Sequence, residues 1–161
     1  MCRKKIIEVE VEEFLNISEL NDQDVDLIQN AKNAIALSYS PYSKFRVGAA
    51  ALLDNGKVLL GSNQENASYS LCMCAERVLL GYISSLYPQS KIISMAITAS
   101  NKENPVKVPI SPCGACRQVL SEKEDMQNQS FSLILHGETG KVYKLNSCKS
   151  LLPLSFDNSY L

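Results

Sequence analysis

Two short cysteine-containing segments place the strongest constraint on how this chain folds. They read Cys74-Ala75-Glu76-Arg77 and Pro112-Cys113-Gly114-Ala115-Cys116. Each segment lies where a predicted helix begins, and the unpaired N–H groups and partial positive charge of a helix N-terminus lower the pKa of a thiol and favour the thiolate. Zinc requires thiolates, so we expect the fold to bring both helix N-termini to one metal ion.

The number of cysteines in these segments indicates the kind of zinc site. Cys74, Cys113 and Cys116 are the predicted ligands of one zinc ion per chain. Three protein ligands with an open fourth position are typical of a catalytic zinc, whereas a structural zinc is closed by four. Cys72 or His136 could supply a fourth ligand, although Cys72 would compete with Cys74 for the geometry of the same turn.

Glu76 follows a predicted ligand by two residues, so a carboxylate shares the first helical turn with Cys74. A glutamate at such a position is usually only a favourable charge near a helix start. Beside C-x-E and P-C-x-x-C segments it becomes a candidate general acid and base. This combination matches the signature of zinc-dependent deaminases.

The spacing of apolar residues predicts one compact α/β domain without internal repeats. The predicted elements are, in order, a helix at 22–38, strands at 45–53 and 57–62, a helix at 74–87, a strand at 92–99, a helix at 114–124, and strands at 131–136 and 141–145. The last two strands are too close in sequence for a parallel crossover, so we predict that they pair antiparallel.

The N-terminal extension, residues 1–20, is kept apart from the single domain of residues 21–161. Residues 6–13 alternate apolar and acidic side chains, a pattern that fits an edge strand but also tolerates a helix, and both remain open. The extension carries no visible chemistry.

Composition excludes several classes of protein. With 161 residues, a net charge of −1 and a pI near 5.9, the chain lacks the basic character that binding a phosphate backbone requires, so we expect no nucleic-acid partner. No signal peptide and no run of membrane-spanning length is visible, so we expect a cytoplasmic protein with no membrane partner. Four of the six cysteines cluster, which favours metal binding over disulfides.

From about residue 31 to residue 161 the chain resembles the small homotetrameric cytidine deaminases. The matching segments occur in the same order and at similar spacing: Ser40-Pro41-Tyr42-Ser43-Lys44-Phe45, Val47-Gly48-Ala49-Ala50, Asn63-Gln64-Glu65-Asn66-Ala67, Cys74-Ala75-Glu76-Arg77, Ser111-Pro112-Cys113-Gly114-Ala115-Cys116-Arg117-Gln118, and Leu151-Leu152-Pro153 with Phe156. The resemblance implies a three-layer α/β/α fold with a mixed five-stranded sheet. It also implies hydrolytic deamination of free cytidine and deoxycytidine by a zinc-bound hydroxide, as in pyrimidine salvage, with no organic cofactor.

The resemblance also assigns residues to the nucleoside. Asn63 and Glu65 match the residues that hydrogen-bond the ribose 3′-hydroxyl, and Phe45 matches a residue that lines the pyrimidine pocket. An ordinary polar loop and a core aromatic are the alternatives for these positions.

Other matching residues imply shared active sites in a homotetramer. Phe156 would approach the base from a neighbouring subunit, and Ala67 and Tyr69 match positions contributed across the interface. Arg77 matches a residue that hydrogen-bonds the zinc-ligating thiolates. Three thiolates over-neutralise a zinc dication, and a neighbouring guanidinium would draw part of their negative charge away from the metal. We assign no role to four residues, namely Arg46, Cys2, Cys72 and Cys148.

Three other functions fit parts of this sequence. An editor of bases in tRNA or single-stranded DNA uses the same metal chemistry, but those relatives usually have a helical crossover between the last strands. Blasticidin-S deaminase, which acts on a cytosine nucleoside analogue, has similar cysteine spacing but lacks the ribose segment seen here at 63–66. A non-enzymatic zinc-binding module would bind metal without turnover.

Overall fold

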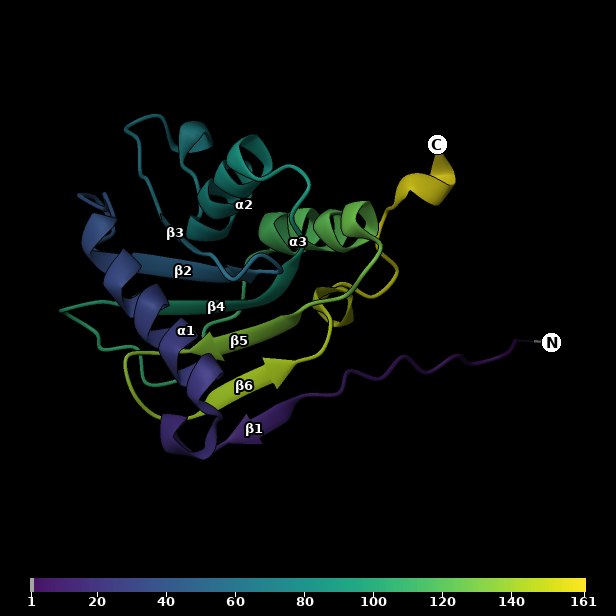
Figure 1. The fold of residues 1–161 in the computed structure, drawn as a ribbon, viewed down its shortest axis with the longest axis horizontal. Helices are drawn as coiled ribbons and strands as arrows, with labels where there is room; N and C mark the ends of the chain where they lie inside the picture. Colours follow the sequence, from purple (N-terminus) through teal and green to yellow (C-terminus); the bar gives the residue numbers. More distant parts are fainter. Residues whose placement is uncertain (1) are drawn as a thin grey trace.

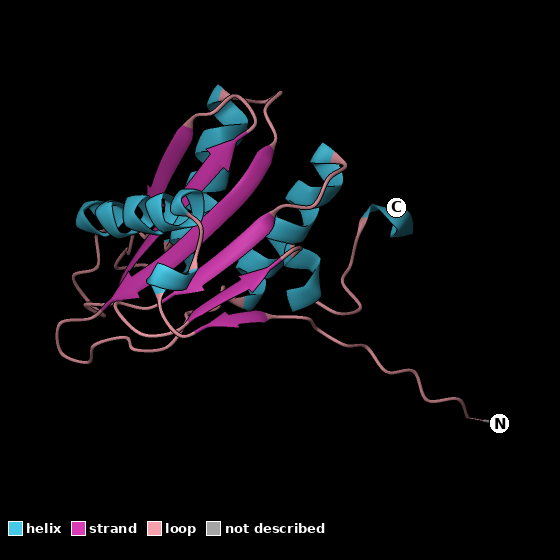
Figure 2. Ribbon diagram, turned by 60° about the horizontal axis from the view of Figure 1, so that its bottom comes forward, coloured by secondary structure: helices cyan, strands magenta, loops and turns pink. Residues whose placement is uncertain are grey.

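The computed structural model, which describes residues 2–161, contains a mixed six-stranded sheet with helices on both faces (Figures 1 and 2). The elements are β1 (Glu12–Phe14), η1 (Ile17–Glu19), α1 (Asp22–Ala34), η2 (Ile35–Leu37), β2 (Arg46–Leu53), β3 (Val58–Ser62), η3 (Tyr69–Leu71), α2 (Ala75–Leu86), β4 (Ile92–Ser100), α3 (Gly114–Gln127), β5 (Ser132–His136), β6 (Val142–Leu145), η4 (Cys148–Leu151) and η5 (Asn158–Tyr160). The strand order is β1-β6-β5-β4-β2-β3, and β4 and β5 are its parallel pair.

The two faces of the sheet build two separate apolar clusters, because successive side chains of a strand point to opposite sides. On β2, Ala49 and Ala51 belong to the cluster under α2 and α3, whereas Ala50 belongs to the cluster under α1. Strands β4 and β5 alternate in the same way. The predicted three-layer α/β/α arrangement is therefore confirmed.

Two glycines allow helices to approach the sheet closely. A Cβ atom on Gly48 of β2 would lie 2.0 Å from the backbone oxygen of Ala31 in α1. A Cβ atom on Gly61 of β3 would lie 2.6 Å from the Cβ of Leu79 in α2. Both helices depend on these positions lacking a side chain, and α2 carries part of the site described below.

The predicted order of helices and strands is confirmed from α1 to β6, and β5 and β6 pair antiparallel as expected. The strand count was wrong, since the sheet has six strands instead of five. The additional strand, β1, comes from the N-terminal extension and pairs antiparallel with β6, where Glu13 forms an ion pair with Lys141 at 2.6 Å. The edge-strand alternative for residues 6–13 is thus realised only at their end.

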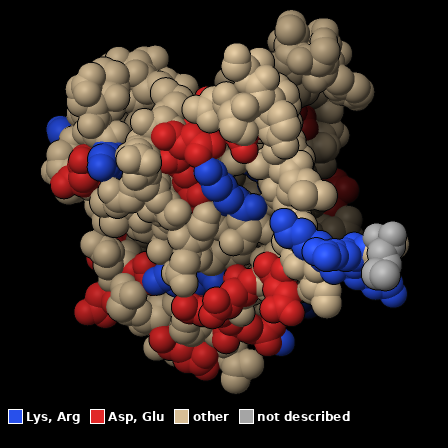
Figure 3. All heavy atoms as spheres, turned by 90° about the vertical axis from the view of Figure 1, so that its right-hand side faces the viewer, with Lys and Arg blue, Asp and Glu red and all other residues tan. Residues whose placement is uncertain are grey.

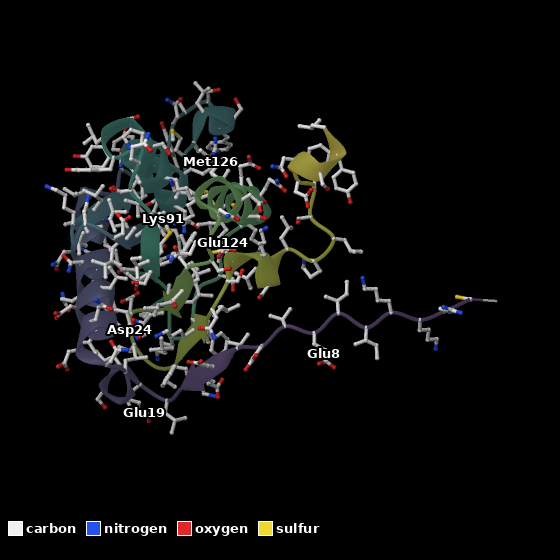
Figure 4. All side chains as sticks on the ribbon, turned by 45° about the vertical axis from the view of Figure 1, so that its right-hand side comes forward. Glu8, Glu19, Asp24, Lys91, Glu124 and Met126 are labelled. Carbon is white, nitrogen blue, oxygen red and sulfur yellow. The ribbon has the colours of Figure 1, made fainter. Side chains whose placement is uncertain are left out.

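Residues 2–11 have no regular secondary structure and extend away from the sheet, as the position of Glu8 shows (Figure 4). Basic side chains gather at the tip of this segment (Figure 3), which contains Arg3, Lys4 and Lys5. Elsewhere on the face in Figure 3, acidic side chains form the larger groups. Among the described residues, no helix is both long enough and apolar enough to span a membrane.

Candidate active site

The two cysteine segments meet where α2 and α3 begin. Cys74 is the N-cap residue of α2 and Cys113 is the N-cap residue of α3, and neither side chain caps its own helix. Cys116 lies in the first turn of α3 and Glu76 in the first turn of α2. Both helix N-termini therefore direct their positive ends at the same thiols.

The three sulfur atoms fit a single zinc ion. The Sγ of Cys113 lies 3.8 Å from that of Cys74 and 3.5 Å from that of Cys116, and all three lie within 4.8 Å of one another. Ligands at about 2.3 Å from a tetrahedral zinc stand about 3.8 Å apart. Cys74, Cys113 and Cys116 therefore form the zinc site predicted from the sequence.

Cys74 and Cys116 differ in how readily their thiols lose a proton. A hydrogen bond from Cys116 is the main cause that lowers the pKa of Cys74 to about 6, against opposing effects of burial and of Glu76. The same hydrogen bond, together with burial, raises the pKa of Cys116 well above its ordinary value. Cys74 is thus the first thiolate, and zinc must displace the proton that Cys116 retains.

Glu76 is buried next to this cluster, with 4% of its surface exposed, and it lines a cavity. Burial raises the pKa of its carboxyl group, although hydrogen bonds from its own backbone N–H and from Cys116 work in the other direction. A carboxylate with a raised pKa is suited to accept and return protons near neutral pH.

The cavity has a volume of about 450 Å³, within the range of small-molecule sites. Its lining residues are Ser43, Phe45, Val47, Asn63, Gln64, Glu65, Cys72, Met73, Cys74, Glu76, Ile97, Ile110, Ser111 and Cys113. The structure thereby brings Phe45, Asn63 and Glu65 together with Glu76 and two of the zinc ligands.

Asn63 also holds the wall of this cavity in place. Its Oδ1 accepts hydrogen bonds from the hydroxyl of Ser38 at 2.6 Å and from the N–H of Val47 at 2.8 Å. Its Nδ2 donates to the carbonyl oxygen of Phe45 at 2.9 Å. One amide hydrogen remains for a ligand.

Glu65 fixes the turn that precedes Phe45. One carboxylate oxygen accepts from the N–H groups of Tyr42 at 2.9 Å and Ser43 at 3.3 Å, and the other accepts from the hydroxyl of Ser43. Burial works to raise the pKa of Glu65, but these hydrogen bonds outweigh it and leave the pKa below its ordinary value. The group is therefore an ionised acceptor at neutral pH.

Three predicted substrate residues do not line the cavity of their own chain. Ala67 and Tyr69 lie on the surface, Tyr69 with 75% of its area exposed, and its ring packs edge-on against Tyr42. Phe156 lies in the C-terminal segment and is 58% exposed. Within residues 2–161, the cavity lacks all three.

Arg77 is exposed on α2 and lines a groove between α2 and α3 instead of the cavity. Within the described part of the chain it forms no hydrogen bond to a thiol. Its charge is only a minor contribution to the lowered pKa of Cys74, and its predicted contact with the thiolates stays a prediction.

Neither candidate for a fourth protein ligand joins the sulfur cluster. The thiol of Cys72 interacts with the backbone of Asn66, whose N–H lies 3.2 Å from its sulfur. His136 is buried in β5. Among the described residues the cluster therefore has three ligands, as a catalytic zinc site requires.

Sequence reasoning missed several residues of the cavity wall. Val47, Ile97 and Ile110 supply apolar surface, and Ser111 is a further polar residue of the lining. Val47 and Ser111 belong to segments that resemble the cytidine deaminases, and that resemblance was the available signal. Ile97 and Ile110 carried none, because their place depends on the packing of β4 and the loop after it.

This α/β/α fold, with three thiols and a buried glutamate at one cavity, defines a zinc-dependent deaminase. The family described as the cytidine and deoxycytidylate deaminase zinc-binding region matches residues 21–139. The chain belongs to this family.

Individual proteins support the same assignment. The chain is 37% identical to a cytidine deaminase of Halalkalibacterium halodurans over 132 residues, which is 81% of this chain and 91% of the relative. A crystal structure of cytidine deaminase from Burkholderia pseudomallei is 36% identical, with a TM-score of 0.70 over 85% of this chain and 100% of the other. The cytidine deaminase of Mycobacterium tuberculosis is 31% identical, with a TM-score of 0.62 over 85% and 98% of the two chains.

Proposed function

We propose that this protein hydrolyses free cytidine and deoxycytidine to uridine and deoxyuridine with release of ammonia, a reaction of pyrimidine salvage. The observation that carries the proposal is the position of Glu76, buried in a nucleoside-sized cavity beside the thiols of Cys74 and Cys113. The relatives named as cytidine deaminases support the same reaction.

Glu76 serves each proton step of this reaction. It accepts a proton from the attacking water and delivers it to N3 of the base as the new C4–O bond forms. It then takes the remaining proton of the oxygen on C4 and delivers it to the amine, which leaves as ammonia when the C4–N bond breaks and the C4 carbonyl forms. A zinc ion held by the three thiolates supplies the Lewis acid that makes this water reactive. Burial of Glu76 keeps the proton within the site between steps.

The ribose is held by polar side chains that line the same cavity as Cys74 and Cys113. Of about four acceptor sites on the Glu65 carboxylate, three are filled by Tyr42 and Ser43, which leaves one for the 3′-hydroxyl proton. The free amide hydrogen of Asn63 donates to the oxygen of the same hydroxyl. Phe45 lies against the pyrimidine.

The substrate is a nucleoside and not a nucleotide. The residues that line the cavity in the described chain include the carboxylates of Glu65 and Glu76 but no lysine, arginine or histidine to receive a phosphate. A cytosine nucleoside analogue such as blasticidin S is the alternative substrate, and the ribose contacts of Glu65 and Asn63 favour cytidine over it.

The active enzyme is a homotetramer with shared active sites. Large apolar side chains are exposed beside the cavity at Tyr69, Leu71 and Met73, and in the C-terminal segment at Leu154 and Phe156. Exposed apolar groups of this extent usually mark a contact surface. In this arrangement Phe156 reaches the base in an adjoining subunit, and Ala67 and Tyr69 contribute to the ribose across the interface.

Assembly and activity should therefore be lost together. Removal of residues 151–161 should dissociate the tetramer in sedimentation experiments, whereas Phe156→Ala should mainly impair nucleoside turnover. Full activity of a monomeric wild-type protein at nanomolar dilution would rule out shared sites.

Residues 21–161 form the catalytic domain in this proposal, and residues 1–20 are an extension that adds β1 to the sheet. The free thiols that the zinc site needs persist in a reducing compartment, and we therefore place the enzyme in the cytoplasm.

A substrate panel tests the reaction. Purified protein is offered cytidine, deoxycytidine, blasticidin S, adenosine and tRNA separately, and the release of ammonia is measured for each. We expect release from the first two substrates. Zinc binding without ammonia release from any of them would indicate a non-enzymatic zinc module.

A further inference from the structure

The C-terminal segment ends in a small ordered unit that the proposed reaction does not fully explain. The rings of Phe156 and Tyr160 stack with centroids 5.4 Å apart and an angle of 11° between their planes. The side chain of Asp157 accepts a hydrogen bond from the N–H of Ser159 at 2.9 Å and caps η5. Phe156 and Tyr160, here called the C-terminal aromatic pair, are 58% and 70% exposed.

Two side chains that follow a zinc ligand hold this segment on the body of the protein. Arg117 donates from Nε to the carbonyl oxygen of Pro112 and from Nη1 to that of Leu151, both at 2.9 Å. Gln118 donates from Nε2 to the carbonyl oxygen of Phe156, also at 2.9 Å. The helical turn that supplies Cys116 therefore also anchors the backbone of the aromatic pair.

The pair is held at its backbone, and neither ring lines the cavity of the same chain. Phe156 does not line that cavity, and the C-terminal segment projects from the side of the molecule near α3 (Figures 1 and 2). Stacking on Tyr160 and the cap formed by Asp157 restrict the orientation of the Phe156 ring before it docks on another molecule. Such preorganisation reduces the entropy lost on docking.

We propose that Gln118 is a positioning residue that acts on the pocket of a neighbouring subunit, by fixing the direction in which the C-terminal aromatic pair leaves its own subunit. The partner is a second copy of this chain, and the inference rests on the proposed function, in which Phe156 completes the neighbour's pocket. Gln118 touches neither the substrate nor the metal.

The kinetic signature of this role follows from what Phe156 does. Its ring contacts the base but moves no proton, so misplacing it weakens nucleoside binding more than the chemical step. Gln118→Glu keeps the shape of the side chain but removes the N–H donor to Phe156. We expect a rise in KM for cytidine of at least about fivefold, the size of one neutral hydrogen bond, because the carboxylate also repels the carbonyl oxygen of Phe156; kcat and zinc content should change little.

Mixed tetramers separate an effect on the neighbour from an effect on the same chain. One chain, the tail donor, carries Glu76→Gln and an intact Phe156. The other, the pocket donor, carries Phe156→Ala and an intact Glu76. The reference mixture of the two should recover activity, because some pockets combine an intact Glu76 with an intact Phe156.

Gln118→Glu is then added to one chain at a time. In the tail donor it should raise the KM of the recovered activity at least about fivefold. In the pocket donor, whose own tail already lacks the Phe156 ring, the same substitution should leave KM unchanged from that of the reference mixture. Circular dichroism and zinc analysis of each variant confirm that the fold and the metal site persist.

The outcomes distinguish a failure of the role of Gln118 from a failure of the shared pocket. In the first case the reference mixture recovers activity, but its KM changes with Gln118→Glu only in the pocket donor, or in neither chain. Either result overturns the role of Gln118 and leaves the shared pocket intact. No recovery in the reference mixture overturns the shared pocket itself and the role of Gln118 with it.

Discussion

At the scale of single residues, Glu76 is the group on which the proposed reaction depends most directly. Glu76→Gln preserves the shape of the side chain but removes the proton carrier, so turnover should fall about 10³-fold or more. Zinc content and the unfolding temperature should stay near those of the parent protein. Activity within about tenfold of the parent, roughly 1.4 kcal/mol in the barrier, would remove Glu76 from this role.

Glu65 anchors Tyr42 and Ser43, and in the proposed function it also binds the ribose; a pair of variants separates these two roles. Glu65→Ala removes both the ribose acceptor and the anchor of Ser43, whereas Ser43→Ala removes part of the anchor and leaves the carboxylate. We expect Glu65→Ala to lower kcat/KM for cytidine far more than for free cytosine, and Ser43→Ala to have a smaller effect on both. Equal losses for the two substrates in Glu65→Ala would contradict a contact with ribose.

The sequence predicted the zinc ligands and Glu76 because their signal is local. Each lies within a few residues of a helix start, and the spacing of C-x-E and P-C-x-x-C is read directly from the chain. The anchoring by Asn63 was not predicted, since its partners at Ser38, Phe45 and Val47 lie on segments that only the folded sheet brings together. Hydrogen bonds between distant segments leave no periodic pattern in the sequence.

At the scale of elements, the close approach of α1 to β2 leaves no room for a side chain at position 48. Gly48→Ala should destabilise the protein by about 1–3 kcal/mol, because its Cβ would overlap the oxygen of Ala31. Gly81 is the matched control, as it lies in α2 with nothing within 4 Å of an added Cβ. Gly81→Ala should stabilise by about 0.5–1 kcal/mol through its better helix propensity.

Urea unfolding of both glycine variants beside the parent measures these differences. The expected order of stability is Gly81→Ala, then the parent, then Gly48→Ala. A Gly48→Ala protein as stable as the parent would mean that α1 does not approach β2 as closely as the structure indicates.

Helices and central strands were predictable because each is long enough to show its period, and their observed ends differ from the predicted ones by only a few residues. Strand β1 has three residues, too few for a period to identify it. Its pairing with β6 joins positions such as Glu12 and Lys144, far apart in the chain. The sequence therefore could not distinguish an edge strand from a helix in residues 6–13.

At the scale of the whole molecule, zinc joins the start of α2 to the start of α3. Removal of the metal with a chelator should abolish activity and lower the unfolding temperature, because the thiols then lose the bond that unites the two helices. One equivalent of zinc, but not of magnesium, should restore both properties. A metal content far from one zinc per chain would contradict the site.

The affinity for zinc should also depend on pH in a defined direction. The raised pKa of Cys116 means that the metal-free cluster still holds a proton at neutral pH, and this proton must leave on binding. Affinity should therefore increase as the pH rises from about 6 to about 8, with proton release on binding. Competition with a chromophoric chelator measures both, and an affinity independent of pH would contradict the proton held by Cys116.

The two chain ends differ in their contacts with the rest of the molecule, and this has a practical consequence for anyone who prepares this protein. Residues 2–11 extend away from the body without regular secondary structure, so an affinity tag or a fluorescent fusion added before them meets no packed surface. The opposite end is occupied by an ordered unit that Gln118 ties to the helix of Cys116. In the proposed tetramer, a fusion after Leu161 would crowd the rings of Phe156 and Tyr160 where they meet the neighbouring subunit, and the activity of a protein purified that way would be misleadingly low.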